Sequence, residues 1–186
     1  MRITTGTFRS RLIKYPKHIR PTQDKIRKSI FDIISQVVAG SKFLELFAGS
    51  GAIGIEALSN AAKEVIFVDS DIRCCKIIGS NLRALGLISK EGQADILAKD
   101  ALKAIELLAN QSRKFDILFL DPPYYQDLVK KTLQKIAVCD ILTPHALVIV
   151  EHNKKDILED NLLNLTRFKQ KRYADTLLSF YERSKQ

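Results

Sequence analysis

Apolar runs typical of buried strands alternate with helical patterns along most of this 186-residue chain. Such runs lie at residues 43–47, 65–69, 94–99, 115–120 and 146–151. Between them, apolar positions recur at helical spacing and predict helices over residues 51–60, 72–85, 101–110 and 127–138. Near-continuous apolar strands that alternate with helices predict a parallel sheet covered by helices on both faces.

The N-terminal residues predict a separate local structure. Residues 2–15 hold two short strand-like segments around Gly6, which predicts a small β-hairpin. Thr22 is typical of a helix N-cap, and apolar residues at helical spacing follow it. We therefore expect a basic hairpin and linker over residues 1–21 and a single α/β domain over residues 22–186.

The C-terminal residues break the alternation of strand and helix. Residues 167–173 and 176–182 are two strand-like segments separated by Ala174-Asp175. A short polar turn between two strands predicts an antiparallel pair at the edge of the sheet.

The composition is that of a globular protein. Apolar residues make up 46% of the chain and charged residues 27%, no apolar run is as long as a membrane span, and no signal-peptide core is present. Pro16 and Pro21 argue against a mitochondrial transit helix. Cys74, Cys75 and Cys139 form neither a disulfide framework nor a zinc-site spacing, so we expect reduced thiols, a cytoplasmic location and no metal.

The net charge of +9 is concentrated near the N-terminus. Residues 1–28 hold nine Lys or Arg against one acid, whereas the other 158 residues carry a net charge of +1. This pattern is typical of polyanion binding, although a solvated basic face would have the same composition. Phe8 and Tyr15 lie among the charges and favour nucleic acid. The predicted RNA-binding residues are Arg9, Arg11, Lys14, Arg20, Thr22, Lys25 and Arg27.

A glycine-rich turn follows the first apolar run. Gly49, Gly51 and Gly54 fit the G-x-G-x-x-G spacing, which permits a tight turn and the close approach of a cofactor. Asp69 ends the next strand, where a carboxylate can accept both ribose hydroxyls of an adenosine cofactor. These features fit NAD as well as S-adenosylmethionine (SAM).

Two further acids favour SAM over NAD. Glu45 lies four residues before the loop and can bind the cationic amino group of a methionine tail. Asp100 and the backbone N–H of Ala101 follow the third strand and can meet an adenine ring. A chain of this length also leaves little room for the substrate domain of an NAD enzyme. The predicted cofactor-binding residues are Glu45, Phe47, Ala48, Gly49, Ser50, Gly51, Asp69, Ser70, Asp100 and Ala101.

Asp121-Pro122-Pro123-Tyr124 ends the fourth apolar run, at the sheet edge where open α/β sheets bind ligands. The Asp121 carboxylate and the Pro122 carbonyl can each accept one N–H of an exocyclic base amine and orient its nitrogen. Tyr124 can stack on an extruded base. We therefore expect Asp121, Pro122 and Tyr124 to be catalytic residues, the alternative being a turn that only ends the strand.

Over its whole length the chain resembles the bacterial small-subunit rRNA guanine-N2 methyltransferases of the RsmD family. The matching segments are Arg20-Pro21-Thr22, residues 45–51, Asp121–Tyr124, and Tyr173 with Thr176-Leu177. The resemblance implies a Rossmann-like class I sheet of seven strands, the last antiparallel, with SAM as cofactor and S-adenosylhomocysteine as product. It also implies a guanine of 16S rRNA as target, presented in the 30S subunit or its assembly intermediate. Separately, we expect the enzyme to be a monomer.

Ser10 and Ala174 stand where the family commonly has glycine, which bears on target identity more than on chemistry. Two other functions stay open: a DNA adenine or cytosine amino methyltransferase and a non-catalytic rRNA-binding assembly factor. The acids and the chain length noted above argue against a third, an NAD-dependent oxidoreductase. The DNA enzymes usually carry a separate sequence-reading region. Intact Glu45, Asp69 and Asp121 argue against a decayed site.

Overall fold

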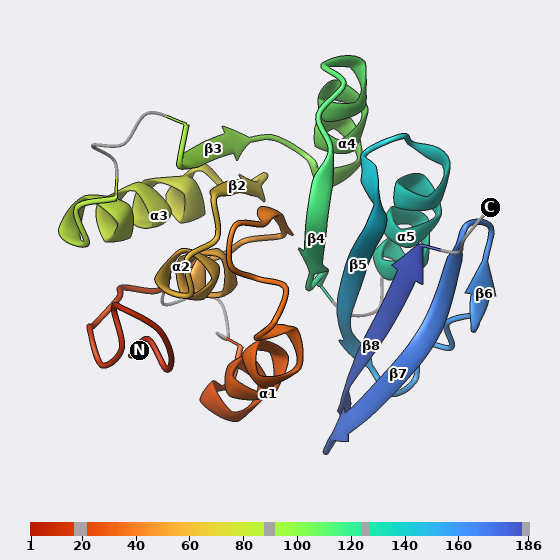
Figure 1. The fold of residues 1–186 in the computed structure, drawn as a ribbon, viewed down its shortest axis with the longest axis horizontal. Helices are drawn as coiled ribbons and strands as arrows, with labels where there is room; N and C mark the ends of the chain where they lie inside the picture. The colour runs from red at the N-terminus through yellow and green to blue at the C-terminus, as the bar shows by residue number, and fades with distance from the viewer. Residues whose placement is uncertain (17–21, 88–91, 124–126, 184–186) are drawn as a thin grey trace.

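The computed structural model describes residues 1–16, 22–87, 92–123 and 127–183, so the predicted Arg20 and Tyr124 lie outside the described residues (Figure 1). The helices are α1 Asp24–Ile34, α2 Ala52–Ser59, α3 Ile72–Ala84, α4 Ala101–Asn110 and α5 Leu128–Val138. The strands are β1 Lys42–Leu46, β2 Glu64–Asp69, β3 Ala94–Ala98, β4 Phe115–Leu120, β5 Leu142–Asn153, β6 Asn161–Leu162, β7 Leu165–Tyr173 and β8 Thr176–Arg183.

The described strands form one sheet in the order β3-β2-β1-β4-β5-β8-β7-β6. The first five are parallel, and β8, β7 and β6 continue the sheet in antiparallel pairs. The α/β class and the mostly parallel sheet are confirmed; the described chain has eight strands instead of seven because the two-residue β6 pairs with β7. The strand order reverses between β1 and β4, and such a switch point is where open α/β sheets bind ligands.

Helices cover both faces of the sheet, as the apolar strands predict (Figure 1). On one face α1, α2 and α3 pack through Ile30, Ile53 and Ile78. On the other face α4 and α5 pack through Ile105 and Leu133. Because successive strand side chains point to opposite faces, every second residue of each central strand faces the same group of helices.

The N-terminal segment forms a shorter hairpin-like loop than the sequence predicts. Within residues 1–16, an antiparallel bridge joins Arg2 and Leu12, and the N–H groups of Ile3 and Ile13 donate across it to the carbonyl oxygens of Arg11 and Met1, both at 3.0 Å. The loop is docked on α2, where a Cβ atom on Gly6 would lie 2.0 Å from the Ser59 carbonyl oxygen. Ile3 and Ile13 are buried in the same core as α1 and α2. The segment therefore packs against the α/β domain, while the predicted boundary at residue 21 lies outside the described residues.

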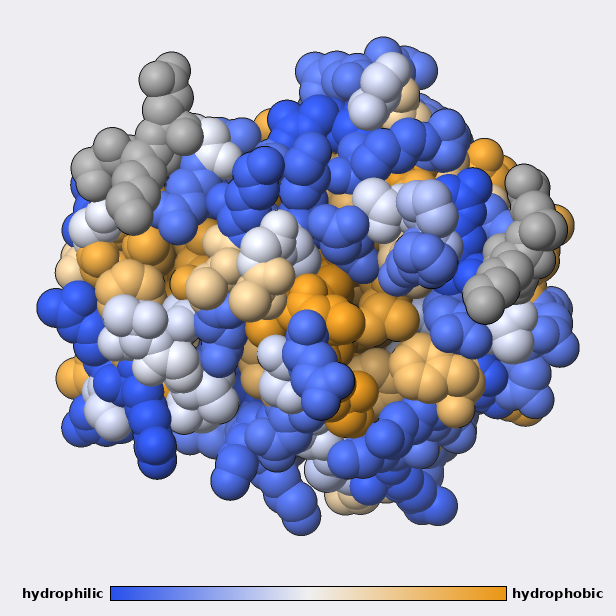
Figure 2. Space-filling view, in the orientation of Figure 1, coloured by the Kyte–Doolittle hydropathy of each residue, from blue (hydrophilic) through white to orange (hydrophobic). Residues whose placement is uncertain are grey.

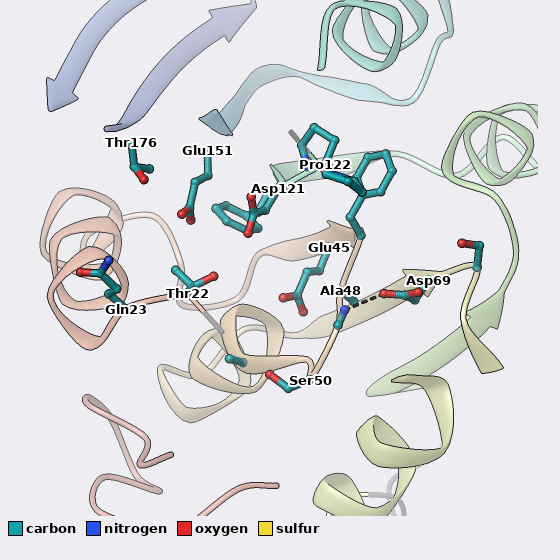
Figure 3. Close-up of a pocket in the computed structure, with 16 residues that line it drawn as sticks. Thr22, Gln23, Glu45, Ala48, Ser50, Asp69, Asp121, Pro122, Glu151 and Thr176 are labelled. Carbon is teal, nitrogen blue, oxygen red and sulfur yellow. Dashed lines mark hydrogen bonds between the residues drawn. The ribbon is translucent and has the colours of Figure 1, made fainter. Parts of the chain in front are cut away.

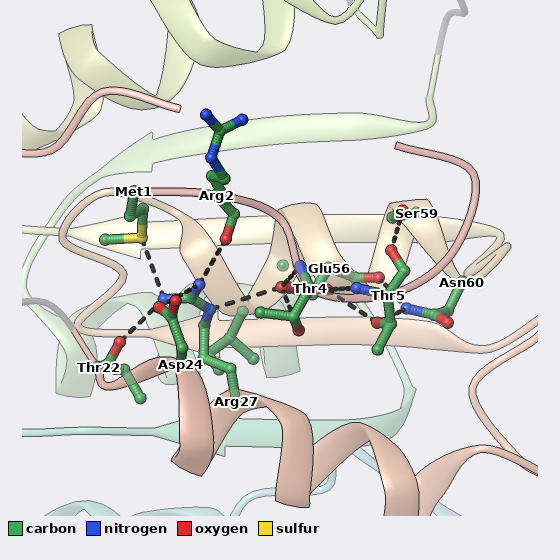
Figure 4. A network of polar contacts seen from close by, with 12 residues as sticks. Met1, Arg2, Thr4, Thr5, Thr22, Asp24, Arg27, Glu56, Ser59 and Asn60 are labelled. Atoms are coloured by element: carbon green, nitrogen blue, oxygen red, sulfur yellow. Dashed lines mark hydrogen bonds and ion pairs between the residues drawn. The ribbon is translucent and has the colours of Figure 1, made fainter. Parts of the chain in front are cut away.

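A buried ion pair holds this loop in place (Figure 4). Arg27 of α1 and Glu56 of α2 are both 1% exposed, with Arg27 Nε 3.5 Å from Glu56 Oε1. The Arg27 guanidinium also donates to the carbonyl oxygens of Arg2 at 2.6 Å and Thr22 at 2.9 Å. The prediction that Arg27 contacts RNA is wrong, because its charge is used inside the protein.

Candidate active site

A cavity of about 370 Å³ opens beyond the carboxyl ends of the central strands (Figure 3). It lies at the switch point between β1 and β4. Its lining residues are Thr22, Gln23, Glu45, Phe47, Ala48, Gly49, Ser50, Ala52, Asp69, Ser70, Phe119, Asp121, Pro122, Pro123, Glu151 and Thr176. The structure therefore brings most of the predicted cofactor-binding residues together with the Asp-Pro-Pro segment.

Carboxylates from four adjacent strands reach this cavity: Asp69 from β2, Glu45 from β1, Asp121 after β4 and Glu151 from β5. Each acid lies two positions after a residue that packs toward α1–α3, and these residues are Phe67, Phe43, Phe119 and Ile149. The two-residue alternation of a strand thus turns all four acids to one face. No Lys, Arg or His is among the described residues that line the cavity. The site is therefore suited to a cationic ligand.

Glu45 connects the cavity to the start of α2. Its carboxylate accepts hydrogen bonds from the backbone N–H groups of Ile53 at 3.3 Å and Gly54 at 2.9 Å. It thereby caps a helix whose own N-cap residue is a glycine. The pKa of Glu45 is raised to about 8, chiefly by burial and in smaller part by the charges of Asp69 and Asp121. The two hydrogen bonds act in the opposite direction and lower it. A cation beside Glu45 would favour its ionised form.

The predicted cofactor loop, residues 47–51, contains three residues with left-handed backbone conformations. Phe47, Gly49 and Gly51 have positive φ angles of 59°, 56° and 73°. Asp69 fixes the loop, because its Oδ2 accepts the Gly49 N–H at 2.7 Å and its Oδ1 accepts the Asp71 N–H at 2.8 Å. Each carboxylate oxygen can accept a second hydrogen bond. Asp69 can therefore hold the loop and still accept ribose hydroxyls.

Two loop glycines serve packing between α2 and the sheet. Gly51, predicted to bind cofactor, does not line the cavity, and a Cβ there would lie 3.1 Å from Phe67 and Ile78 side-chain atoms. A Cβ on Gly54 would lie 2.3 Å from Phe67 Cε1 and 2.8 Å from Glu45 Oε2. The third glycine of the pattern thus allows α2 to approach β2 closely.

We expect Gly54→Ala to destabilise the protein by about 1–3 kcal/mol, because the added methyl group overpacks the contact with Phe67. Gly79→Ala is the matched control. Gly79 also lies inside a helix, but a Cβ there would meet its nearest atom at 3.7 Å. Removing that glycine should stabilise the protein by roughly 0.5–1 kcal/mol. Urea unfolding of both variants measures the difference, and equal shifts would contradict the packing role of Gly54.

The third predicted acid position lies apart from the cavity. Asp100 is exposed at the N-terminus of α4, where its side chain accepts the Lys103 N–H at 3.1 Å. Ala101 is buried in the packing of α4. Neither residue lines the cavity. Their contact with adenine stays a prediction.

The described part of the Asp121–Tyr124 segment lies at the predicted ligand edge of the sheet. Asp121, Pro122 and Pro123 line the cavity directly after β4. Burial raises the pKa of Asp121 to about 7, so its proton can be lost near neutral pH. Such a pKa suits a group that accepts hydrogen bonds and protons under physiological conditions.

Several cavity residues were not predicted from the sequence: Gln23, Ala52, Phe119, Pro123, Glu151 and Thr176. Glu151 had a signal, because it ends an apolar run as Asp69 does. Gln23 precedes α1 and Thr176 begins β8, so only the tertiary structure brings them beside the loop. Thr22, predicted to bind RNA, also lines the cavity.

Apolar and basic residues occupy different parts of the surface around the cavity. Figure 2 shows apolar residues gathered near the middle of this face, where β4 ends, between hydrophilic margins. Arg9, Arg11, Lys14 and Lys25 are exposed as predicted. Lys25 Nζ lies 5.8 Å from the centre of the Tyr173 ring, at the end of β7. Exposed cations therefore lie on both the N-terminal loop and the start of α1.

Among the described residues, no helix combines the length and hydropathy needed to cross a membrane. Within the same residues, no group of three or more His, Cys, Asp or Glu side chains is arranged to hold a metal ion.

The family model described as conserved hypothetical protein 95 matches residues 1–182. YlbH of Bacillus subtilis, a candidate rRNA methyltransferase by its name, is 33% identical over 185 residues, which cover 98% of this chain and 99% of YlbH. Ribosomal RNA small subunit methyltransferase D of Haemophilus influenzae is 33% identical over 156 residues, or 83% of this chain and 79% of that protein.

Solved structures share the fold. That of yhhF from Escherichia coli, a candidate methyltransferase, aligns with 100% of this chain and 99% of its own at a TM-score of 0.84 and 26% identity. SMU.776, a candidate methyltransferase in complex with S-adenosylhomocysteine, aligns with 88% of this chain and 50% of its own at a TM-score of 0.71. At 16% identity the second likeness concerns the fold alone.

Proposed function

The chain belongs to the RsmD family of SAM-dependent methyltransferases, and on this premise we propose that it methylates the exocyclic N2 amine of one guanine in 16S rRNA. The substrate is the 30S subunit or its assembly intermediate, and the enzyme acts as a cytoplasmic monomer. The small-subunit rRNA target follows the names of the relatives.

The observation that carries this proposal is the cavity with four carboxylates and no basic group among its described lining residues. SAM bears an ammonium and a sulfonium charge, so this donor set fits it. The anionic pyrophosphate of NAD would face the same carboxylates and be repelled. Glu45 would hold the ammonium group and Asp69 the ribose hydroxyls, beside the Gly49–Gly51 turn.

Bound SAM supplies an electrophilic methyl group on its sulfonium sulfur. The Asp121 carboxylate and the Pro122 carbonyl accept the two N–H groups of the guanine amine and aim its nitrogen lone pair at that methyl group. Asp121 then accepts the proton that the methylated nitrogen must lose. Tyr124, outside the described residues, is proposed to stack on the base.

The proposal is tested by labelling with tritiated SAM. Free 16S rRNA, 30S particles from cells lacking the enzyme, and duplex DNA are incubated in parallel, and the labelled nucleoside is identified. We expect N2-methylguanosine from RNA or 30S particles. Label in DNA adenine or cytosine would favour the DNA enzyme, and the absence of label with intact SAM binding would favour the assembly factor.

We expect cofactor binding to release a proton from Glu45. Because burial raises the pKa of Glu45 to about 8, this group is mostly protonated in the free protein near pH 7. The ammonium group of the cofactor favours the carboxylate, so affinity should rise with pH up to about 8, by up to tenfold per unit for one proton. Calorimetry of S-adenosylhomocysteine in buffers of different ionisation enthalpy measures the proton. Glu45→Gln should bind more weakly and without this release.

We expect the basic N-terminal loop to hold RNA phosphates. Replacing the exposed Arg9, Arg11 and Lys14 together with Ala should flatten the salt dependence of RNA binding by about two units, at roughly 0.7 per phosphate on single strands. S-adenosylhomocysteine affinity should not change. Filter binding of 16S rRNA across a potassium chloride series measures the slope.

The control for this variant removes the same charge from the other face of the sheet. Lys103 of α4 and Lys130 and Lys131 of α5 are exposed there. Their triple Ala variant should keep a steeper slope than the N-terminal variant. Equal slopes in the two variants would mean that net charge alone, and not the N-terminal loop, determines RNA affinity.

A further inference from the structure

Asn81 of α3 joins two segments that have different proposed roles. It is 2% exposed, and its Oδ1 accepts the backbone N–H of Lys14 at 2.8 Å. Its Nδ2 donates to the Lys14 carbonyl oxygen at 2.9 Å and to the Ser50 carbonyl oxygen at 3.1 Å. Lys14 belongs to the basic loop, and Ser50 lies in the cofactor loop. One buried side chain therefore contacts both.

The three hydrogen bonds specify an amide at this position. Asn offers two N–H donors and one carbonyl acceptor, and here both donors and the acceptor are used. A flipped amide would place its oxygen against the carbonyl oxygens of Lys14 and Ser50. Asp would likewise lose both donors, and Leu would lose all three hydrogen bonds while keeping a similar size. The backbone at Lys14 and the backbone at Ser50 thus depend on one group.

We propose that Asn81 is a positioning residue that couples RNA engagement by the N-terminal loop to SAM binding by the cofactor loop. Phosphate contacts that fix the backbone at Lys14 would fix Asn81, and Asn81 would then hold the Ser50 carbonyl in the position that the cofactor needs. By linkage, bound cofactor strengthens RNA binding by the same factor. This inference rests on the proposed function for its RNA arm only.

A matched control exists at Asn60, at the end of α2. Asn60 Nδ2 also holds the N-terminal loop, donating to Thr5 Oγ1 at 2.7 Å and to the Glu56 carbonyl oxygen at 2.7 Å. None of these contacts reaches the cofactor loop. A variant at Asn60 therefore loosens the same loop without removing the connection to Ser50.

The first experiment measures the dissociation constant of S-adenosylhomocysteine with and without saturating unmodified 16S rRNA. We expect RNA to tighten binding about fivefold or more in the wild type, the usual lower range of coupling between sites. The ratio should fall to near one in Asn81→Leu and in Asn81→Asp, and remain at the wild-type value in Asn60→Leu. A wild-type ratio in both folded Asn81 variants would overturn the proposal.

The second experiment needs no RNA. Hydrogen exchange of the peptide that spans residues 12–16 is followed with and without S-adenosylhomocysteine. The ligand should slow exchange at Lys14 in the wild type and in Asn60→Leu, but not in Asn81→Leu. Unchanged exchange at Lys14 in the wild type would overturn the coupling even if rRNA methylation is normal. Slowed exchange without methylation of any rRNA would instead contradict the proposed function.

Discussion

Replacing Asp121 with Ala should lower the single-turnover methylation rate by about 100-fold or more, the scale of losing one preorganised electrostatic group. S-adenosylhomocysteine binding should remain nearly intact, because Asp121 faces the acceptor side of the cavity in our proposal. Rapid-quench measurements at saturating SAM with the 30S substrate give the rate. A near-wild-type single-turnover rate in Asp121→Ala would refute the catalytic role.

The pH dependence of the methylation rate tests whether Asp121 acts as an ionised carboxylate. Burial raises the pKa of Asp121 to about 7, and only the carboxylate can accept both a hydrogen bond and a proton. A rate that needs the carboxylate should therefore rise with pH through about 7 and level off above it. The positive charge of the cofactor favours the carboxylate and shifts this rise to lower pH.

Asp121→Asn is the control for that profile. An amide oxygen can still accept one N–H of the guanine amine, so Asn should retain more activity than Ala. The amide does not titrate, and the acidic limb of the rate profile should disappear. If Asp121→Asn keeps the limb, another group, such as Glu45 with its pKa raised to about 8, produces it.

Replacing Arg27 with Met should destabilise the protein by about 3–5 kcal/mol, the cost of leaving one member of a buried ion pair without its partner. Arg27 and Glu56 are each 1% exposed. Glu56 would keep four hydrogen bonds from the backbone N–H and hydroxyl groups of Thr4 and Thr5 but lose its neutralising charge. Urea unfolding measures the change in the free energy of unfolding.

A double-mutant cycle tests whether the pair acts as a unit. Arg27→Met combined with Glu56→Gln should cost less than the sum of the two single changes, because no isolated charge then stays buried. Arg73→Met is a control at an ion pair with Asp71, where the Arg73 side chain is 69% exposed, and it should change stability little. Additive effects at Arg27 and Glu56 would contradict the coupling.

The buried pair also bears on how the basic segment functions. Residues 1–28 contain nine basic side chains, but they do not form one exposed surface. Arg27 is buried and holds the N-terminal loop against α1 and α2. Removing the N-terminal residues would expose Glu56 and its partner. Charge variants at exposed positions are therefore a cleaner test of RNA binding than truncation.

The sequence alone predicted the parallel sheet and the position of its ligand edge. Strand and helix signals are local: an apolar run such as Phe115–Leu120 is long enough for a buried strand and has no helical spacing. The strand-ending acids Asp69 and Asp121 could be identified for the same reason, and both line the cavity. The sequence predicted that this strand starts at residue 146, whereas β5 begins at Leu142. Pro144 lies between the two positions, where the register with β4 shifts.

Only the tertiary structure decided which residues face each other. Glu56 accepts hydrogen bonds from Thr4 and Thr5 and thereby docks the N-terminal loop on α2, although it lies more than fifty residues from them in the sequence. The sequence places Arg27 among exposed basic residues, whereas in the structure it is buried and pairs with Glu56. Thr176 lies beside the cavity because β8 pairs with β5 in antiparallel register, which places it opposite Asn153 at the end of β5. Such contacts depend on how elements pack, and a local pattern of apolar and polar residues does not specify them.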